Sequence, residues 1–330
     1  MNTFSFELKK EVACVLPSGD EESLSQLSAI IKTCGEITKN GTQEKLLIFT
    51  EIEEVANLVA DIVKNLYGES VEKKFSHLAF SKNTRYEICI PASITKEVLL
   101  DTEVMQYDEE KYFAFVPNIS EYMIAEESRE LAFLRGVFVG CFSCNINMQE
   151  VDENLSSNNN FSASKNHYGY HAEFVFSNEH FARDFCVLLA DFDIISKMTP
   201  RKNTFVVYVK GLDMISDLLA LVGATKGSLK LQNIGVIRSV RNNINRQNNC
   251  INANLTKMVD ASVKQMRAIE KIENTIGIEA LDEPLKEVVY LRLANPEESL
   301  DSLIKLSTKP ISKSGLYHRL KKIEKIAEKL

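Results

Sequence analysis

The N-terminal part of the chain alternates between apolar runs with helical spacing and apolar runs with strand spacing. In the stretch 53–67, for example, Val55, Val59 and Ile62 fall on one helical face, which predicts a helix. Residues 85–90 alternate as in a strand, and Pro91 ends the run. Together these patterns predict helices over 24–34, 53–67 and 94–100, and strands over 45–50 and 85–90.

The same order of elements returns further along the chain. The second set of patterns predicts helices over 127–142, 179–189 and 212–221, and strands over 170–176 and 204–209. Between the first of these helices and the next strand, residues 147–169 are rich in Asn and Ser, a composition typical of a surface loop. The recurrence indicates an internal duplication, with repeats at about 1–115 and 116–222.

The C-terminal end has an all-helical pattern. It predicts a helix over 255–272, a helix over 283–293, and a second short helix that opens at Pro296 and Glu297. Pro310 breaks that helix, and Ser312 is a good N-cap for a last one. The apolar stripe of the last helix comprises Leu316, Leu320, Ile323, Ala327 and Leu330. Short helices joined by tight turns are typical of a helix-turn-helix.

The polar face of the last helix is the first candidate nucleic-acid site. Its residues are basic, hydroxyl-bearing or aromatic, and they gather toward the helix N-terminus, the part that a recognition helix presents to base edges in the major groove. The candidate DNA-binding residues on this helix are Lys313, Ser314, Tyr317, His318, Arg319, Lys321 and Lys322, with Arg319 placed to reach phosphate. A solvated helix face with ordinary lysines is the alternative interpretation.

A second candidate lies in the segment 223–250, which glycines punctuate and in which arginines and asparagines recur. Arginine suits phosphates and guanine, and asparagine suits adenine. The candidate residues are Arg238, Arg241, Asn242, Asn245 and Arg246. On chemistry alone this segment is equally well explained as a basic, polar linker between domains, in which asparagine serves turns.

Charge is segregated along the chain. The net formal charge of −7 is unusual for a nucleic-acid binder. From Lys226 onward, however, the chain contains 19 Lys and Arg and 12 Asp and Glu. Residues 1–225 contain 20 Lys and Arg and 34 Asp and Glu. A basic end on an acidic body predicts a polyanionic partner for the end only.

The remaining features point to a cytoplasmic protein without a cofactor. No apolar run approaches the ~20 residues that span a bilayer, and residues 1–10 suggest an amphipathic helix rather than a signal peptide. Seven scattered cysteines do not suggest a disulfide framework. Cys141 and Cys144 with His167 and His171 resemble a zinc finger only superficially, because 22 residues separate Cys144 from His167. No phosphate-binding glycine loop occurs, and no metal or catalytic site is predicted.

Two segments resemble the LAGLIDADG helix of homing endonucleases: LSAIIKTCG at 27–35 and LRGVFVGCF at 134–142. The resemblance implies two such helices packed at the centre of a duplicated domain, where small residues allow close approach. In that family an acidic eighth residue holds a divalent metal, and those positions are Cys34 and Cys141 here. Neither is a hard oxygen ligand. Glu36 lies near the first position, but nothing acidic lies near the second, so the resemblance implies a scaffold that does not cut DNA.

The chain from Glu7 to Lys329 resembles the WhiA family of bacterial sporulation and cell-division regulators. The likeness rests on LAFLRGVFVG at 131–140, KNTFVVYVK at 202–210, RNNINRQNNCINANLTK at 241–257, RLANPEESLDSL at 292–303 and PISKSGLYHRLKKI at 310–323. It implies an α+β protein: a degenerate LAGLIDADG domain, αββαββα in each repeat, over 1–222, then the linker 223–250 and an all-α helix-turn-helix domain over 251–330.

The function that this resemblance implies is sequence-specific binding of promoter DNA at the nucleoid, in control of transcription, sporulation or cell division, without enzymatic activity. The alternative is a platform for protein partners in cell-division control, formed by the acidic N-terminal domain, with DNA binding confined to the tail. An active nuclease is a third hypothesis, against which Cys34 and Cys141 argue.

Overall fold

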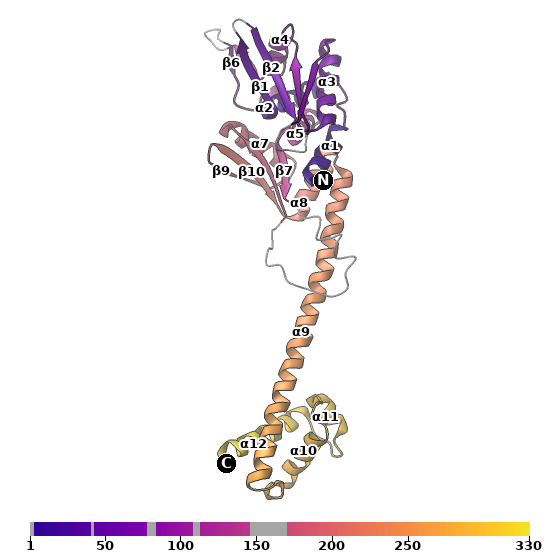
Figure 1. The fold of residues 1–330 in the computed structure, drawn as a ribbon, viewed down its shortest axis with the longest axis vertical. Helices are drawn as coiled ribbons and strands as arrows, with labels where there is room; N and C mark the ends of the chain where they lie inside the picture. The colour runs from indigo at the N-terminus through magenta and orange to yellow at the C-terminus, as the bar shows by residue number, and fades with distance from the viewer. Residues whose placement is uncertain (1–2, 41–42, 78–83, 108–112, 146–169) are drawn as a thin grey trace. The chain divides into compact units, whose positions relative to one another are not determined.

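A computed structural model of the chain describes residues 3–40, 43–77, 84–107, 113–145 and 170–330 (Figure 1). The predicted Asn- and Ser-rich loop at 147–169 lies outside these residues, as does His167. The chain divides into two compact units, Met1–Ile237 and Arg238–Leu330. Within the described residues, no helix has the length and apolar character needed to cross a membrane.

The first unit contains the predicted duplication, and each repeat has the order αββαββα. The first repeat comprises α2 (Asp20–Cys34), β1 (Gly35–Asn40), β2 (Gln43–Thr50), α3 (Glu53–Tyr67), β3 (Glu72–His77), β4 (Thr84–Ile90) and α4 (Thr95–Asp101). The second comprises α5 (Glu127–Cys141), β7 (Phe142–Asn145), β8 (His171–Phe176), α7 (Glu179–Asp191), β9 (Ser196–Arg201), β10 (Thr204–Lys210) and α8 (Leu212–Val222). The expected α+β fold is confirmed.

Both repeats form antiparallel four-stranded sheets of the same topology, β1-β2-β4-β3 and β7-β8-β10-β9. Alternate residues of the inner strands point into one common core, as Ile48 does on β2 and Phe174 on β8. Between the repeats lie the short hairpin of β5 (Met105–Tyr107) with β6 (Phe113–Phe115) and the 3-10 turn η1 (Glu121–Ile124). One core therefore joins the two repeats.

The two LAGLIDADG-like helices, α2 and α5, pack against each other at the centre of this unit (Figure 1). Their backbones approach closely at Gly136, where a Cβ atom would lie 2.5 Å from the carbonyl oxygen of Gln26 and 2.6 Å from the Cβ of Ala29. At the N-terminal end of α5, the buried Arg129 pairs with Glu21 of α2 at 2.8 Å. Small residues in the motif thus have the packing role that the resemblance implied.

An additional helix, α1 (Phe4–Ala13), precedes the repeats and begins three residues later than the expected helix at 1–10. It packs on α5, α3 and β7. Its Glu11 carboxylate accepts hydrogen bonds from the backbone of Lys226 at 2.8 Å and Gly227 at 3.2 Å. These amides are at the start of α9 (Thr225–Thr275), so Glu11 satisfies unpaired donors at that helix N-terminus and complements its positive dipole.

The structure corrects the expected linker at 223–250. Gly223, with φ +95°, ends α8, and α9 begins two residues later and includes every candidate residue of the Arg/Asn segment. The boundary expected at 250/251 therefore falls inside a helix. The glycines that suggested irregular structure serve packing instead, because a Cβ at Gly235 would lie 2.5 Å from Leu212. A helical apolar stripe through Val236, Val240 and Ile244 was the sequence signal for this helix.

The second unit is entirely helical among its described residues. After α9 come the 3-10 turn η2 (Ile278–Ala280), α10 (Glu283–Ala294), α11 (Leu300–Leu306) and α12 (Lys313–Lys329). The expectation that Pro296 and Glu297 open the second short helix is wrong. That helix begins after Ser299, whose hydroxyl accepts a hydrogen bond from the backbone of Ser302 and caps it. The core comprises Ala268, Ile269, Ile272, Ile278, Leu281, Leu285, Val288, Val289, Leu303, Leu316, Leu320, Ile323 and Ala327.

Candidate nucleic-acid interface

Helix α12 is held by its apolar stripe and by its cap. Leu316, Leu320 and Ile323 are buried against α10 and α11. The side chain of Ser312 accepts a hydrogen bond from the backbone of Gly315 at 3.1 Å, as the sequence predicted. Leu330 departs from the expected stripe, because it is 42% exposed. The first turns of α12 are therefore fixed in orientation, and the face opposite the stripe is turned to solvent.

That outward face carries the predicted residues of the tail. The structure leaves exposed Lys313, Ser314, Tyr317, His318 and Lys322, and leaves half-buried Arg319 and Lys321. The rings of Tyr317 and His318 lie edge to face at 5.7 Å, and the ammonium of Lys321 lies 5.9 Å from the Tyr317 ring centroid. The face thus combines positive charge, hydroxyl groups and an aromatic surface, the chemistry that reads base edges and phosphates.

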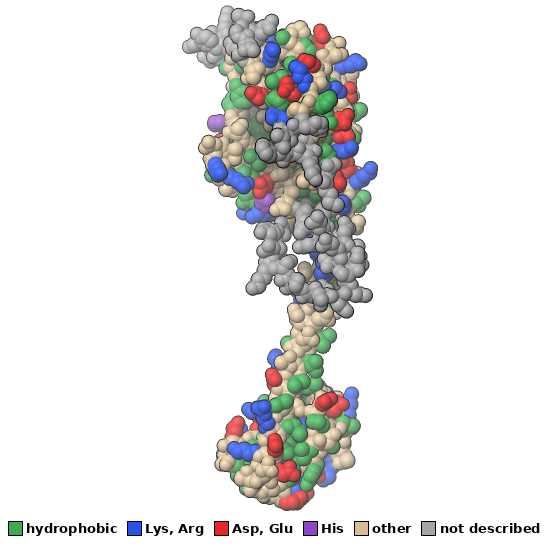
Figure 2. Space-filling model, viewed as in Figure 1, with side chains coloured by type: hydrophobic (Ala, Val, Ile, Leu, Met, Phe, Trp, Pro, Cys, Tyr) green, Lys and Arg blue, Asp and Glu red, His purple; other side chains and the backbone are tan. Residues whose placement is uncertain are grey.

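Two of these lysines form exposed ion pairs. Lys313 lies 2.6 Å from Asp301 of α11, and Lys322 lies 3.3 Å from Asp282. Figure 2 shows the same mixture of basic and acidic side chains over this unit. Exposed pairs contribute little stability, roughly 0–1 kcal/mol, so these ammonium groups can exchange a carboxylate for a phosphate at low cost.

Lys321 differs from the other lysines because its partner is buried. Glu324 is 5% exposed. Its carboxylate accepts a hydrogen bond from Lys321 at 2.7 Å and forms an ion pair with Lys264 of α9 at 3.3 Å. A buried carboxylate needs its cations, since an unpaired charge in the interior is costly. Lys321 therefore has a structural role beside any contact with DNA. Nothing in the spacing of the sequence distinguished Glu324 from the exposed acids around it.

A second residue whose role the sequence analysis did not predict is Arg292, which is 2% exposed at the C-terminal end of α10. Its guanidinium donates to the carbonyl oxygen of Glu298 at 2.7 Å, and burial lowers its pKa. The bond holds the turn between α10 and α11, immediately before Ser299. Arg292 thus positions the helix that carries Asp301, the partner of Lys313.

The five predicted residues of the Arg/Asn segment share one face of α9. Arg238, Arg241 and Asn242, and then Asn245 and Arg246, follow the i, i+3, i+4 spacing that places side chains on one side of a helix. We call this the Arg/Asn face. The structure does not bring it together with α12: Lys264, the α9 residue that reaches Glu324, lies about 27 Å along the helix axis from Arg246. They are two separate candidate surfaces.

A third basic surface, which the sequence did not single out, lies on the exposed face of the second sheet. The strand register sets Lys197 beside Tyr208 and Lys210 beside His171. Lys210 lies over the Tyr208 ring at 4.8 Å, and the ring of His171 stacks on it at 5.5 Å. Arg201 joins them, 3.7 Å from Glu173. The first unit is acidic as a whole, but positive and aromatic side chains gather on this face.

The two degenerate metal positions lie at the C-terminal ends of α2 and α5. Burial raises the pKa of the Cys34 thiol to about 11 and that of Cys141 to about 12, so both stay protonated at neutral pH. The ammonium of Lys9, from α1, donates to the carbonyl oxygen of Gly140 at 3.1 Å, and its charge acts on both thiols. Glu36 is exposed on β1. Two neutral thiols beside a lysine do not fit the magnesium ion of a homing endonuclease.

The CxxC pair lies at the junction of α5 and β7. Cys144 is hydrogen-bonded to Ser5 of α1, and burial raises its pKa to about 11. Across the described residues, no group of three or more His, Cys, Asp or Glu could hold a metal ion.

Comparison with known proteins places these features in one family. A model of the WhiA N-terminal LAGLIDADG-like domain matches residues 20–105, a model of the WhiA LAGLIDADG-like domain matches 160–241, and a model of the WhiA C-terminal HTH domain matches 244–327. The models thus cover both repeats and the helical tail.

Curated relatives match over nearly the whole chain. A probable cell division protein WhiA from Clostridium perfringens (strain 13 / Type A) is 34% identical over 331 residues, which cover 99% of this chain and 98% of that protein. Its counterpart from Thermoanaerobacter sp. (strain X514) is 35% identical with the same coverage. The crystal structure of a full-length WhiA from Thermatoga maritima, 24% identical, aligns with a TM-score of 0.57 over 100% of this chain and 99% of that one. This last likeness supports the fold.

Proposed function

Since the chain belongs to the WhiA family, we propose that it is a sequence-specific DNA-binding regulator of transcription, linked to cell division or sporulation and without nuclease activity. It acts in the cytoplasm at the nucleoid, on promoter regions of double-stranded DNA. The observation that carries the proposal is the exposed face of α12, on which Lys313, Ser314, Tyr317 and His318 surround the capped N-terminus of a well-packed helix.

In this proposal the two parts of the tail have different roles. The first turns of α12 enter the major groove and contact base edges, as recognition helices do. Arg319 and the Arg/Asn face of α9 contact phosphates, which fixes the register on the duplex but reads no sequence. The basic face of the second sheet, around Tyr208, adds phosphate contacts from the first unit. The acidic remainder of that unit is left for protein partners.

The absence of nuclease activity follows, in this proposal, from the chemistry of the central helix ends. Hydrolysis of a phosphodiester by a metal-bound water needs carboxylates that hold the metal. Here the half-buried thiols of Cys34 and Cys141 are neutral, because their pKa values are raised, and the Lys9 side chain beside them offers no carboxylate to a metal. The geometry therefore favours a scaffold.

The proposal is tested by incubating the full-length protein with a pool of genomic fragments and magnesium, and scoring both retention and cutting. We expect a reproducible subset of fragments to be retained, with fragment ends unchanged. Defined cleavage products would mean that other carboxylates hold a metal. Retention without any preference among fragments would contradict sequence-specific binding.

The phosphate role of the Arg/Asn face predicts a change in salt dependence. Each phosphate contact that is lost lowers the slope of log K against log salt by about 0.9. We expect Arg246→Gln to lower the slope by this amount on specific and random duplexes alike. Lys64→Gln, on the exposed side of α3, removes the same charge and should leave the slope unchanged. Equal slopes for the two variants would contradict the assignment.

A further inference from the structure

Helix α9 exposes an apolar stripe that no part of the second unit covers among its described residues. Ile251 is 63% exposed, Leu255 52% and Val240 52%, with Ile244 and Val259 each at 48%. Further along the helix, the same side of α9 turns inward and packs in the core of the unit through Ile269 and Ile272. A run of exposed β-branched and leucine side chains on one helix face is a signal of an interaction surface.

The stripe is straight and lies away from Arg238 and Arg246 of the Arg/Asn face, whereas Arg241 flanks it. Val240 and Ile251 lie 11 residues apart, as do Ile244 and Leu255, and an 11-residue repeat returns almost to the same side of a helix. At 100° per residue, Arg238 and Arg246 are more than a quarter turn away from this line. A partner on the stripe therefore does not cover Arg238 or Arg246.

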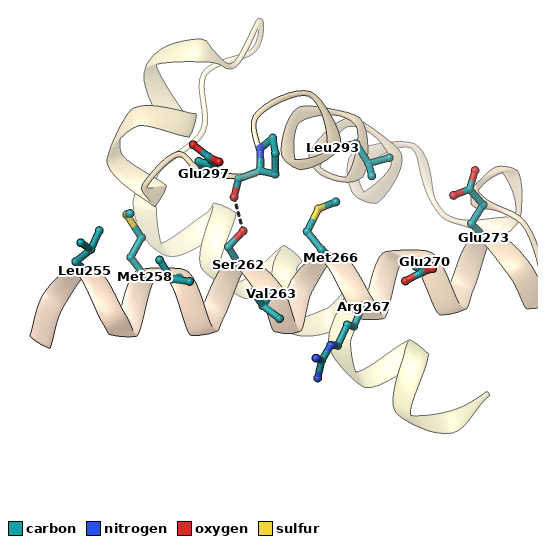
Figure 3. A pocket seen from close by; sticks show the side chains of 12 residues that line it. Leu255, Met258, Ser262, Val263, Met266, Arg267, Glu270, Glu273, Leu293 and Glu297 are labelled. Atoms are coloured by element: carbon teal, nitrogen blue, oxygen red, sulfur yellow. Dashed lines mark hydrogen bonds between the residues drawn. The ribbon is translucent and has the colours of Figure 1, made fainter. Parts of the chain in front are cut away.

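At its C-terminal part the stripe leads into a groove of about 730 Å³ (Figure 3). Leu255, Met258 and Met266 of α9 form its floor, and Leu293 and Pro296 form the opposite wall. The hydroxyl of Ser262 donates to the carbonyl oxygen of Pro296, a bond that ties this wall to the helix. The groove is thus a fixed apolar surface beside an apolar helix, suited to a second helix.

Charge identifies the helix that fits the groove. Three carboxylates, those of Glu270, Glu273 and Glu297, lie among its lining residues beside the single guanidinium of Arg267. The other half of the stripe is complementary: residues 238–254 include three arginines and no acidic residue. A helix with this sequence, laid antiparallel in the groove, brings arginine to the acidic lining and isoleucine to the apolar floor.

We propose that the occupant is a second copy of this chain, and that the protein forms an antiparallel dimer through α9. With the twofold axis near Leu255, Ile251 of each copy meets Val259 of the other, and Ile244 meets Met266. Arg241 then lies beside Glu270, since flanking residues on the same side of two antiparallel helices face each other. A twofold interface of this kind is isologous, so each contact occurs twice.

The inference goes beyond the proposed function and does not depend on it, because a dimer forms in the absence of DNA. It also implies a consequence for recognition. Two copies carry two α12 helices related by a twofold axis, and such dimers bind two half-sites of opposite orientation.

The first test is sedimentation equilibrium of the full-length protein over a range of concentrations. We expect a monomer–dimer equilibrium whose dissociation constant Ile251→Asn raises about a hundredfold, because two apolar contacts are lost per dimer. Val187→Asn, at a residue of α7 that is 62% exposed, makes the same kind of change in the first unit and should have no effect. A monomer at every concentration, or a dimer insensitive to Ile251→Asn, would overturn the inference.

A charge exchange tests the direction of the helices. Arg241→Glu and Glu270→Arg should each weaken the dimer about tenfold, because each places like charges together at two points. The double variant, Arg241→Glu with Glu270→Arg, restores both pairs within one homodimer and should return the dissociation constant to its original value. If the two single effects on the dissociation constant simply multiply in the double variant, the antiparallel arrangement is refuted. Glu270 is exposed and Arg241 is half-buried, so neither change places a charge in the core of the unit.

Discussion

Replacing Lys313 and Tyr317 together by alanine is expected to reduce discrimination between specific and random duplexes about tenfold or more, with a much smaller loss of affinity for random DNA. Both side chains are exposed on the first two turns of α12, the part that enters the major groove in the proposed function. A good base contact contributes roughly 1–3 kcal/mol of discrimination, whereas contacts to phosphate affect all duplexes equally. Competition binding with both duplexes at one fixed salt concentration measures the ratio.

A matched pair controls for the removal of one lysine and one tyrosine. Lys329 is exposed at the far end of the same helix, and Tyr290 is 50% exposed on α10. Lys329→Ala with Tyr290→Ala should leave the ratio of affinities unchanged. If the α12 variant loses affinity for specific and random duplexes equally, its residues contact only the backbone, and the assignment of α12 as the reading helix is wrong.

The strands show what the sequence could and could not predict. The four inner strands, β2, β4, β8 and β10, were all predicted, because each is a short run that contains several β-branched or aromatic residues. The four edge strands were missed. β3 has the sequence EKKFSH and β9 the sequence SKMTPR, and each pairs on one side only. Polar residues and proline protect such edges from aggregation, and they remove the pattern that reveals a strand.

Helix α9 was misinterpreted for a related reason. Glycine and asparagine have low helix propensity, and their density between Gly223 and Asn254 outweighed an apolar stripe with helical period. In the structure, packing overrides propensity at Gly227 and Gly235, where Leu8 and Leu212 occupy the space that a side chain would take. The helix period was present in the sequence, but the propensity of single residues obscured it.

The candidate site was predictable where it depends on one helix and unpredictable where it depends on contacts between helices. The spacing of Lys313 and Tyr317 follows from the period of α12 alone. The pairing of Glu324 with Lys264 brings together residues 60 positions apart in sequence, and the bond from Arg292 shapes a turn. Such contacts arise from tertiary packing, and no local pattern marks them.

Replacing Gly136 by valine is expected to destabilise the first unit more than a substitution at an exposed residue does. We expect it to lower the free energy of unfolding of that unit by about 3 kcal/mol or more. The Cβ would meet the carbonyl oxygen of Gln26 at 2.5 Å, and a backbone atom of a packed helix cannot move aside alone. The helices α2 and α5 would have to separate, which opens the core shared by both repeats. For a unit of this size the loss corresponds to a fall in Tm of roughly 6–12 °C.

Calorimetry of the full-length protein measures this shift, and Gly19→Val is the control. Gly19 precedes α2, has extended backbone angles and would place its Cβ with nothing within 4 Å. A valine side chain at this position costs little stability. The difference in Tm between the two variants therefore measures the effect of the close approach between α2 and α5. If Gly136→Val leaves the Tm of the first unit unchanged, α2 and α5 are not packed as closely as the structure shows. The LAGLIDADG-like motif would then lack the structural reason for its glycine.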